Sequence, residues 1–506
     1  MKRTNIYKIL ISLVLLGFSL QVDIWAEEDK DNDFLFEGYF RQDIVSFSNC
    51  WDLNKKAKDD LSTYFGLDYS FSLTKEWKAS GAKLYLKLER NGPYDYDMPL
   101  FVHNTLKTSS AEVASYRNEE LLPQLEEFWW DMPIFGLAHL KSGLFSYDVG
   151  EGFSLNGGYE NFGFLVYEEK EDFSWRLYYC RPDIVYKNPL GPHILQEESQ
   201  GIDYEPNAAN FLAADIKIIH GQRTVQPYVG TLIDYTSSEK RQSLFAAPIE
   251  RDILGTLGIY WKEGLGRFNF VFELAHNFGQ AKTKNSDYKD IIHTGYLFYQ
   301  KIEYSLPKMS YFLQFLLASG NKVDLESAVN QDEKLVTGKN RAFSYYSPLN
   351  LNLGDSISSL NSDSRPIVSM GTGYGLNYGL SRPGSFSATD FDNIILPAIG
   401  IKLDFTPWIC LQLSGYYLRC FEPGVGVFNG QPKRLSRELG FEIDSILDLR
   451  ISKNTIFTIM GGYFLPGHYY KELRDDSEGS LLSPFVRGDG KADPAYQIEL
   501  AWEFSF

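Results

Sequence analysis

The chain ends in eleven residues, YQIELAWEFSF (Tyr496–Phe506), whose apolar and polar side chains alternate without a break. The apolar positions hold Tyr, Ile, Leu, Trp and Phe, and the positions between them hold Gln, Glu, Ala and Ser. Because successive side chains of a β-strand point to opposite faces, this alternation predicts a strand with one apolar face and one polar face. Chain ends commonly fray, so the three aromatic residues among the last five indicate a strand that is held in place.

The first residues of the chain predict export. Three basic residues within the first eight precede a twelve-residue apolar run, Ile9–Leu20, which is too short to span a bilayer as a helix. We therefore expect residues 1–26 to form a signal peptide that is cleaved after Ala26, with an uncleaved anchor as the alternative interpretation. No later apolar run reaches about eighteen residues, so the sequence predicts no membrane-spanning helix.

The composition favours one large closed sheet. Of the 506 residues, 44% are hydrophobic and 15% are aromatic, yet the mean hydropathy is −0.26 because apolar and polar residues alternate. The 33 Tyr, 36 Phe and 42 Gly residues are typical of strands with aromatic belts and tight turns. No linker-like stretch, composition shift or repeat divides the chain after residue 26, so we expect a single sheet rather than several domains.

Alternating segments recur along the whole chain, and most are about 9–14 residues long, enough for a tilted strand to cross a bilayer. Clear examples are residues 63–73, 82–88, 268–274 and 438–450. Short connections are predicted near residues 133–137, 170–173, 221–223, 263–265, 307–308, 407–408 and 451–453. Long polar connections are predicted at residues 48–61, 92–124, 148–160, 182–209, 237–251, 278–292 and 465–493.

The two kinds of connection must alternate around a membrane barrel, because short turns face the periplasm and long loops face the outside. They do so if residues 320–394 form one large extracellular or pore-folding insertion. This interpretation predicts an all-β fold over residues 34–506, a transmembrane antiparallel β-barrel of eighteen strands with both chain ends periplasmic. We expect residues 496–506 to close the barrel against residues 34–47. A barrel of this size leaves an aqueous channel, which the insertion would constrict or plug.

The polar positions of the predicted strands should line this channel. By alternation, the basic members of the set are Arg41, Lys83, Lys87, Arg176, Lys217, Arg267, Lys301, Lys402 and Arg450. The acidic members include Glu438, Glu442 and Asp444, and acids slightly outnumber bases over the whole set. Rings of Arg or Lys favour anions in a pore, so a mixed wall predicts weak or cation-leaning selectivity. For any single residue, a paired charge that only stiffens the wall is the alternative interpretation.

The motifs give no support to catalytic, metal-binding or nucleic-acid-binding chemistry. The seven histidines show no metal-ligand spacing, and no nucleophile elbow, phosphate-binding loop or Cys-x-x-Cys pair occurs. The chain has a net charge of −17 and no basic stripe to neutralise phosphates, so we expect no nucleic acid partner. We therefore predict no cofactor and no enzyme activity.

Parts of the sequence resemble known outer-membrane proteins. The segment Tyr496–Phe506 resembles the terminal strand of Gram-negative outer-membrane proteins, which the barrel-insertion machinery reads as an address. The run ELGFEID (Glu438–Asp444), followed by GGYFLPGHY (Gly461–Tyr469), is similar to the alginate-export porin family. The start of the insertion at Leu317–Gly320 and the order of strands over residues 138–182 look like that family too.

The resemblance implies an eighteen-stranded porin in the outer membrane of a Gram-negative-type bacterium. The partners that it implies are outer-membrane lipid, the barrel-insertion machinery and a polar solute or oligosaccharide. The expected function is diffusive passage of a polar carbohydrate, anionic if it resembles alginate. A non-specific or plugged structural barrel is the alternative. A hydrolase with catalytic groups at the barrel rim remains a minor alternative, since scattered Ser, His and Asp residues do not exclude one.

Overall fold

The computed structural model describes the sheet and the segments close to it. The described residues are 34–48, 61–78, 80–90, 124–134, 136–155, 162–181, 209–235, 249–283, 289–321, 339–343, 366–367, 393–428, 431–474 and 492–506. The predicted signal peptide, residues 1–26, and most of the predicted insertion, residues 320–394, lie outside this set and stay predictions. No helix among the described residues is long and apolar enough to cross a membrane.

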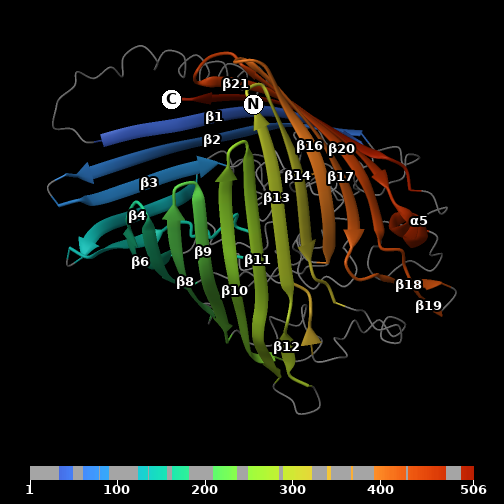
Figure 1. Cartoon of the computed structure of the whole chain (residues 1–506), viewed down its shortest axis with the longest axis horizontal. Coiled ribbons are helices and arrows are strands. Elements are labelled where there is room, and N and C mark those ends of the chain that lie inside the picture. The colour runs from blue at the N-terminus through green and yellow to red at the C-terminus, as the bar shows by residue number, and fades with distance from the viewer. Residues whose placement is uncertain are drawn as a thin grey trace, which may run out of the picture.

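Eighteen long strands form one closed antiparallel barrel in the described part of the chain (Figure 1). These strands are β1 (Phe34–Ser48), β2 (Leu61–Trp77), β3 (Ala82–Arg90), β4 (Gln124–Ile134), β5 (Ala138–Leu144), β6 (Phe162–Glu169), β7 (Phe173–Cys180), β8 (Ala209–His220), β9 (Arg223–Asp234), β10 (Ile249–Leu265), β11 (Phe268–Thr283), β13 (Tyr296–Leu306), β14 (Met309–Ala318), β16 (Ile394–Thr406), β17 (Ile409–Cys420), β20 (Glu438–Arg450), β21 (Thr455–Pro466) and β22 (Ala495–Ser505). Each strand pairs with its neighbours in chain order, and β22 returns to pair with β1. The predicted fold class is confirmed.

The last strand closes the barrel against the first, as the sequence predicts. The pairing runs from Tyr39 opposite Ser505 to Ser48 opposite Tyr496. Beyond it, the backbone of Gly38 exchanges two hydrogen bonds of 3.0 Å with the terminal residue, Phe506. The polar backbone groups at this chain end are therefore paired, which explains how a terminal strand can remain ordered.

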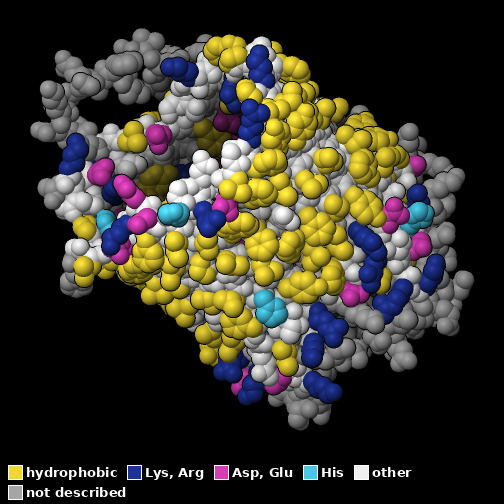
Figure 2. All heavy atoms as spheres, in the orientation of Figure 1, with side chains coloured by type: hydrophobic (Ala, Val, Ile, Leu, Met, Phe, Trp, Pro, Cys, Tyr) yellow, Lys and Arg dark blue, Asp and Glu magenta, His cyan; other side chains and the backbone are white. Residues whose placement is uncertain are grey.

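The two faces of the sheet differ in chemistry as the alternation predicts. On the outer face, Leu313, Ile399 and Trp502 are 56%, 65% and 50% exposed, and Figure 2 shows hydrophobic side chains covering the strands. On the inner face, polar residues such as Gln314 and Glu499 are almost completely buried. An apolar band of this extent is the surface that a membrane barrel presents to lipid.

The turns agree with the prediction except at one hairpin. The turns between β13 and β14 and between β16 and β17 lie at residues 307–308 and 407–408, as predicted. The turn predicted at residues 263–265 is wrong, because β10 continues to Leu265, which pairs with Phe268. The hairpin turns at Gly266 and Arg267 instead, with Gly266 at a φ of 63°, the left-handed conformation that two-residue hairpins favour. Arg267 is therefore an exposed turn residue and not a residue of the barrel wall.

Several short elements lie at the end of the barrel opposite these turns (Figure 1). They are β12 (Ile291–His293), β15 (Lys339–Asn340), β18 (Val425–Phe428), β19 (Gln431–Arg434) and α5 (His468–Arg474). The parallel pairing of β15 with β12 ties part of the predicted insertion to the connection between β11 and β13. None of these elements is long enough to show a periodic pattern, so the sequence did not predict them.

Candidate functional site

The inner face of the barrel is the candidate functional site, because the strands turn their polar side chains to it. Near the closure, Nη2 of Arg41 donates to Oε1 of Glu499 at 2.5 Å, and Nε of Arg41 lies 3.9 Å from Oδ2 of Asp43. The strand register places Asp68 of β2 and Glu503 of β22 directly beside Arg41. One guanidinium therefore lies among carboxylates that outnumber it.

A second ion pair lies on β7 and β8. Arg176 donates from Nε to Oδ2 of Asp215 at 2.9 Å and from Nη2 to the carbonyl oxygen of Asp148 at 2.8 Å. Asp215 also accepts hydrogen bonds from Gln226 at 2.8 Å and from the Tyr147 hydroxyl at 2.6 Å. Burial and the neighbouring carboxylate of Asp215 raise the pKa of Tyr147 well above its ordinary value, so the phenol keeps its proton and donates it.

A loop segment folds from the end of β5 onto the inner face, and we call residues 145–155 the inward segment. Its most buried hydrophobic side chains, each at most 1% exposed, are Phe145, Tyr147, Val149, Phe153 and Leu155. The Tyr147 ring stacks on Tyr178 of β7 at a centroid distance of 4.6 Å, and the Phe153 ring lies 4.5 Å from Tyr299 of β13. The segment thus spans the inner wall from β7 to β13.

A single carboxylate holds the far end of the inward segment. Glu273 of β11 is fully buried and accepts hydrogen bonds from the Ser154 hydroxyl at 2.9 Å and the Glu151 N–H at 3.0 Å. The Tyr228 hydroxyl of β9 donates to the same carboxylate at 2.8 Å. A Cβ atom on Gly150 would lie 2.7 Å from Oε2 of Glu273, so a glycine permits this close approach.

The inward segment is the main feature of the site that the sequence reasoning missed. Residues 148–160 were predicted only as a long polar connection. The available signal was that Phe145, Tyr147 and Val149 alternate with polar or small residues beyond the last residue of β5, Leu144, and occupy the positions that are polar within β5. An external loop exposed to water has no physical reason to maintain such a pattern.

Two predicted lysines on β3 lie beside acids. The Nζ atom of Lys83 is 3.3 Å from Oε1 of Glu76 on β2, and about half of each side chain is exposed. Lys87 forms an ion pair with Glu89 two residues along the same strand. These positions alternate along one face of β3, which agrees with their assignment to the inner wall.

The other predicted bases lie on the inner face or at its edge. Lys301 places its Nζ 5.3 Å from the ring centroid of the buried residue Phe312. Lys217 and Lys402 are half-buried. Each lies beside a buried polar residue, which is on the same strand for Lys217 and on the adjoining strand for Lys402. Arg450 is exposed at the short-turn end, where its N–H donates to the carbonyl oxygen of Trp408 at 2.8 Å.

Two of the predicted acids lie deep in the wall of β20. Glu442 and Asp444 are 0% and 3% exposed. Oδ2 of Asp444 accepts a hydrogen bond of 2.9 Å from the N–H of Ile367. Because Ile367 belongs to the predicted insertion, the insertion reaches the inner wall at this point.

The third predicted acid, Glu438, lies at the rim instead. Its Oε2 is 2.5 Å from Nδ1 of His468 on α5, and 41% of its side chain is exposed. The register between β17 and β20 shifts between Leu418 and Arg419, and Gly440 adopts a φ of 147° there. This bulge breaks the simple alternation, so strand periodicity does not carry from Glu442 to Glu438.

Comparisons with known proteins place the fold among outer-membrane porins. No family model matches the chain, and no curated protein matches it. Among solved structures, OccK8 (OprE) of Pseudomonas aeruginosa is 9% identical, with a TM-score of 0.50 over 94% of this chain and 98% of that one. A BenF-like porin of Pseudomonas fluorescens Pf-5 is 8% identical, with a TM-score of 0.49 over 94% and 99% of the two chains.

At this level of identity the comparison establishes the fold alone. The chain has the architecture of an eighteen-stranded outer-membrane porin, and the solved structures that share it are porins rather than enzymes. The narrower resemblance to alginate-export porins receives no support from these structures. Within the described residues, no group of three or more His, Cys, Asp or Glu side chains could hold a metal ion.

Proposed function

We propose that the protein is an outer-membrane channel through which small polar solutes diffuse. The observation that carries this proposal is the pairing of β22 with β1, which closes a sheet whose outer face is apolar and whose inner face is charged. A closed barrel of sixteen or more strands encloses more space than its own wall side chains fill. A water-filled path is therefore the physical expectation.

The charges of the wall favour weak cation preference. The residues beside Arg41 are Asp43, Asp68, Glu499 and Glu503. The electrostatic potential near the closure is therefore negative despite the positive charge of Arg41. A ring of Arg or Lys side chains is what anion selectivity requires. An alginate-like polyanion, which the sequence resemblance suggested, fits such a wall poorly, and we propose uncharged or cationic solutes instead.

The inward segment supplies the narrowest part in this proposal. It covers the inner wall from β7 to β13 and is fixed by buried contacts rather than by exposed loop contacts. The predicted role of residues 320–394 as a further constriction is kept, supported by the contact of Ile367 with Asp444. We also propose that residues 1–26 are removed on export and that Tyr496–Phe506 is the address read by the insertion machinery.

A plugged barrel is the second candidate, and the same inward segment favours it. If the inward segment and residues 320–394 together fill the lumen, the protein would be a structural barrel without solute flux. The two candidates differ only in whether a continuous water path remains.

Swelling of proteoliposomes separates the two candidates. Liposomes that contain the refolded barrel are placed in isosmotic glucose, sucrose or raffinose, and the swelling rate is followed by light scattering. The channel predicts swelling that slows as the solute becomes larger, whereas liposomes with heat-denatured protein should not swell. Absence of swelling in glucose, with the barrel folded, would favour the plugged barrel.

A further inference from the structure

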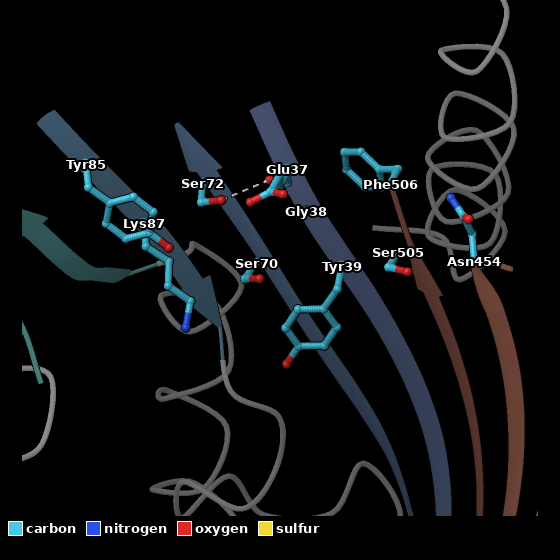
Figure 3. A pocket seen from close by; sticks show the side chains of 10 residues that line it. All are labelled: Glu37, Gly38, Tyr39, Ser70, Ser72, Tyr85, Lys87, Asn454, Ser505 and Phe506. Carbon is cyan, nitrogen blue, oxygen red and sulfur yellow. Dashed lines mark hydrogen bonds between the residues drawn. The ribbon is translucent and has the colours of Figure 1, made fainter. Parts of the chain in front are cut away.

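A hollow of about 390 Å³ opens on the inner wall where the first three strands meet the last one. Figure 3 shows its lining side chains. They come from β1, β2, β3, the end of β22 and the turn that precedes β21. The lining residues that matter for recognition are Glu37, Tyr39, Ser70, Ser72, Tyr85 and Lys87. The hollow lies toward the short-turn end of the barrel, away from the inward segment.

Aromatic surface borders the hollow on two sides. In Figure 3, Tyr39 and Tyr85 stand on either side of Ser70 and Ser72. The Tyr85 ring also stacks on Trp129 of β4, at a centroid distance of 5.1 Å and an interplanar angle of 23°. Aromatic surface therefore continues from the hollow along the wall to β4.

Polar groups of both kinds fill the space between the rings. Ser70 and Ser72 bring hydroxyl groups, Lys87 brings hydrogen-bond donors and Glu37 brings acceptors. Glu37 and Lys87 bear the only charged side chains among the ten residues that line the hollow, and Lys87 also forms an ion pair with Glu89 of β3, so the hollow has no excess of positive charge. A balanced set of donors and acceptors recognises a neutral polar ligand better than an anion.

We propose that this hollow is a transient binding subsite for neutral carbohydrates on their way through the channel. A sugar ring presents an apolar C–H face that can lie on an aromatic side chain and a rim of hydroxyls that both donate and accept hydrogen bonds. The aromatic surface of Tyr85 and Trp129 fits the C–H face of the sugar. The two serines, Lys87 and Glu37 fit its hydroxyl rim. This inference deepens the proposed function and rests on it, because binding is transient only if the sugar passes through an open channel.

Weak binding is part of the proposal. The hollow is an open recess of the wall, so a bound sugar keeps one side in water and leaves readily. Conduction requires sites that favour entry and still release the solute, which a few stacked and hydrogen-bonded contacts provide.

The test measures the current of single channels while maltotriose, a neutral probe, is added in steps. The protein is purified in a detergent without a sugar headgroup, and binding of maltotriose is measured in parallel by calorimetry. We expect maltotriose to interrupt the current and glucuronate, an anionic probe, to do so less at equal concentration. Tyr85→Ala should weaken maltotriose binding about two- to tenfold, as expected for the loss of one ring contact. Tyr85→Phe should retain most of the binding.

Tyr311→Ala is the matched control, since Tyr311 is a tyrosine on the outer face of β14 and 44% exposed. This variant should leave the dissociation constant for maltotriose unchanged, which would show that the effect of the Tyr85 substitution is local. The inference is overturned if maltotriose neither binds nor interrupts the current, if Tyr85→Ala binds it as the native protein does, or if glucuronate is the stronger blocker. Silent bilayers with intact maltotriose binding would instead overturn the proposed channel and leave the binding site standing.

Discussion

At the scale of single residues, a fully buried carboxylate positions the inward segment. Glu273 receives hydrogen bonds from a backbone N–H, a serine hydroxyl and a tyrosine hydroxyl that come from two different parts of the chain. A buried acceptor that satisfies several donors contributes mainly through the cost of leaving those donors unpaired. Removing it should therefore release the segment as well as destabilise the fold.

We predict that Glu273→Ala lowers the free energy of unfolding by at least about 1–3 kcal/mol, the cost of one unsatisfied buried polar group. The conductance should rise because the inward segment is no longer held. Thermal unfolding followed by circular dichroism and single-channel recording measure the two effects. Glu273→Gln, which keeps the shape and one acceptor, should lie between the native protein and the alanine variant. Unchanged conductance in Glu273→Ala would show that the segment is fixed by its aromatic contacts alone.

The close packing around a glycine at the barrel closure leads to a second prediction. A Cβ atom on Gly38 would lie 2.6 Å from Cζ of Phe506 and 2.9 Å from the carbonyl oxygen of Ser70, so Gly38→Ala should destabilise the barrel by about 1–3 kcal/mol. On Gly461, the nearest atom to a Cβ is the carbonyl oxygen of Gln497 at 3.8 Å, an ordinary contact. Gly461→Ala is therefore the control.

The temperature at which the folded barrel loses its compact migration in detergent electrophoresis measures this effect. It should fall for Gly38→Ala and remain close to the native value for Gly461→Ala. Equal temperatures for the two variants would contradict the close packing of Phe506 at the closure.

At the scale of elements, periodicity predicted most of the barrel because each long strand has one face in an apolar environment and one in a polar environment. The same reasoning failed at strand ends and bulges, where the two faces no longer alternate regularly. Arg267 was assigned to the wall, but the strand pairing continues three residues farther, to Leu265, and Gly266 makes the turn. Glu438 was assigned to the wall, but the bulge at Gly440 shifts the faces.

The inward segment was missed for a related reason. Its aromatic residues are buried by contacts with strands far away in the sequence, such as Tyr178 and Tyr299. Local alternation describes which face of a strand is apolar and contains no information about where a loop folds. The contact of Ile367 with Asp444 depends on such long-range packing as well.

At the scale of the whole molecule, the closed sheet and its charges lead to one account. The apolar outer face fits lipid, and the closure between β1 and β22 turns the inner faces of all the strands toward one lumen. On that inner face near the closure, carboxylates outnumber the guanidinium of Arg41. An open, acid-rich lumen should conduct ions and favour cations, with a preference that weakens as salt screens the wall.

Single-channel current across a planar bilayer with a potassium chloride gradient tests this claim most directly. The account predicts steady current steps and a reversal potential on the cation-selective side, closer to zero at higher salt concentration. Silent bilayers with folded protein, or a strongly anion-selective reversal potential, would contradict it.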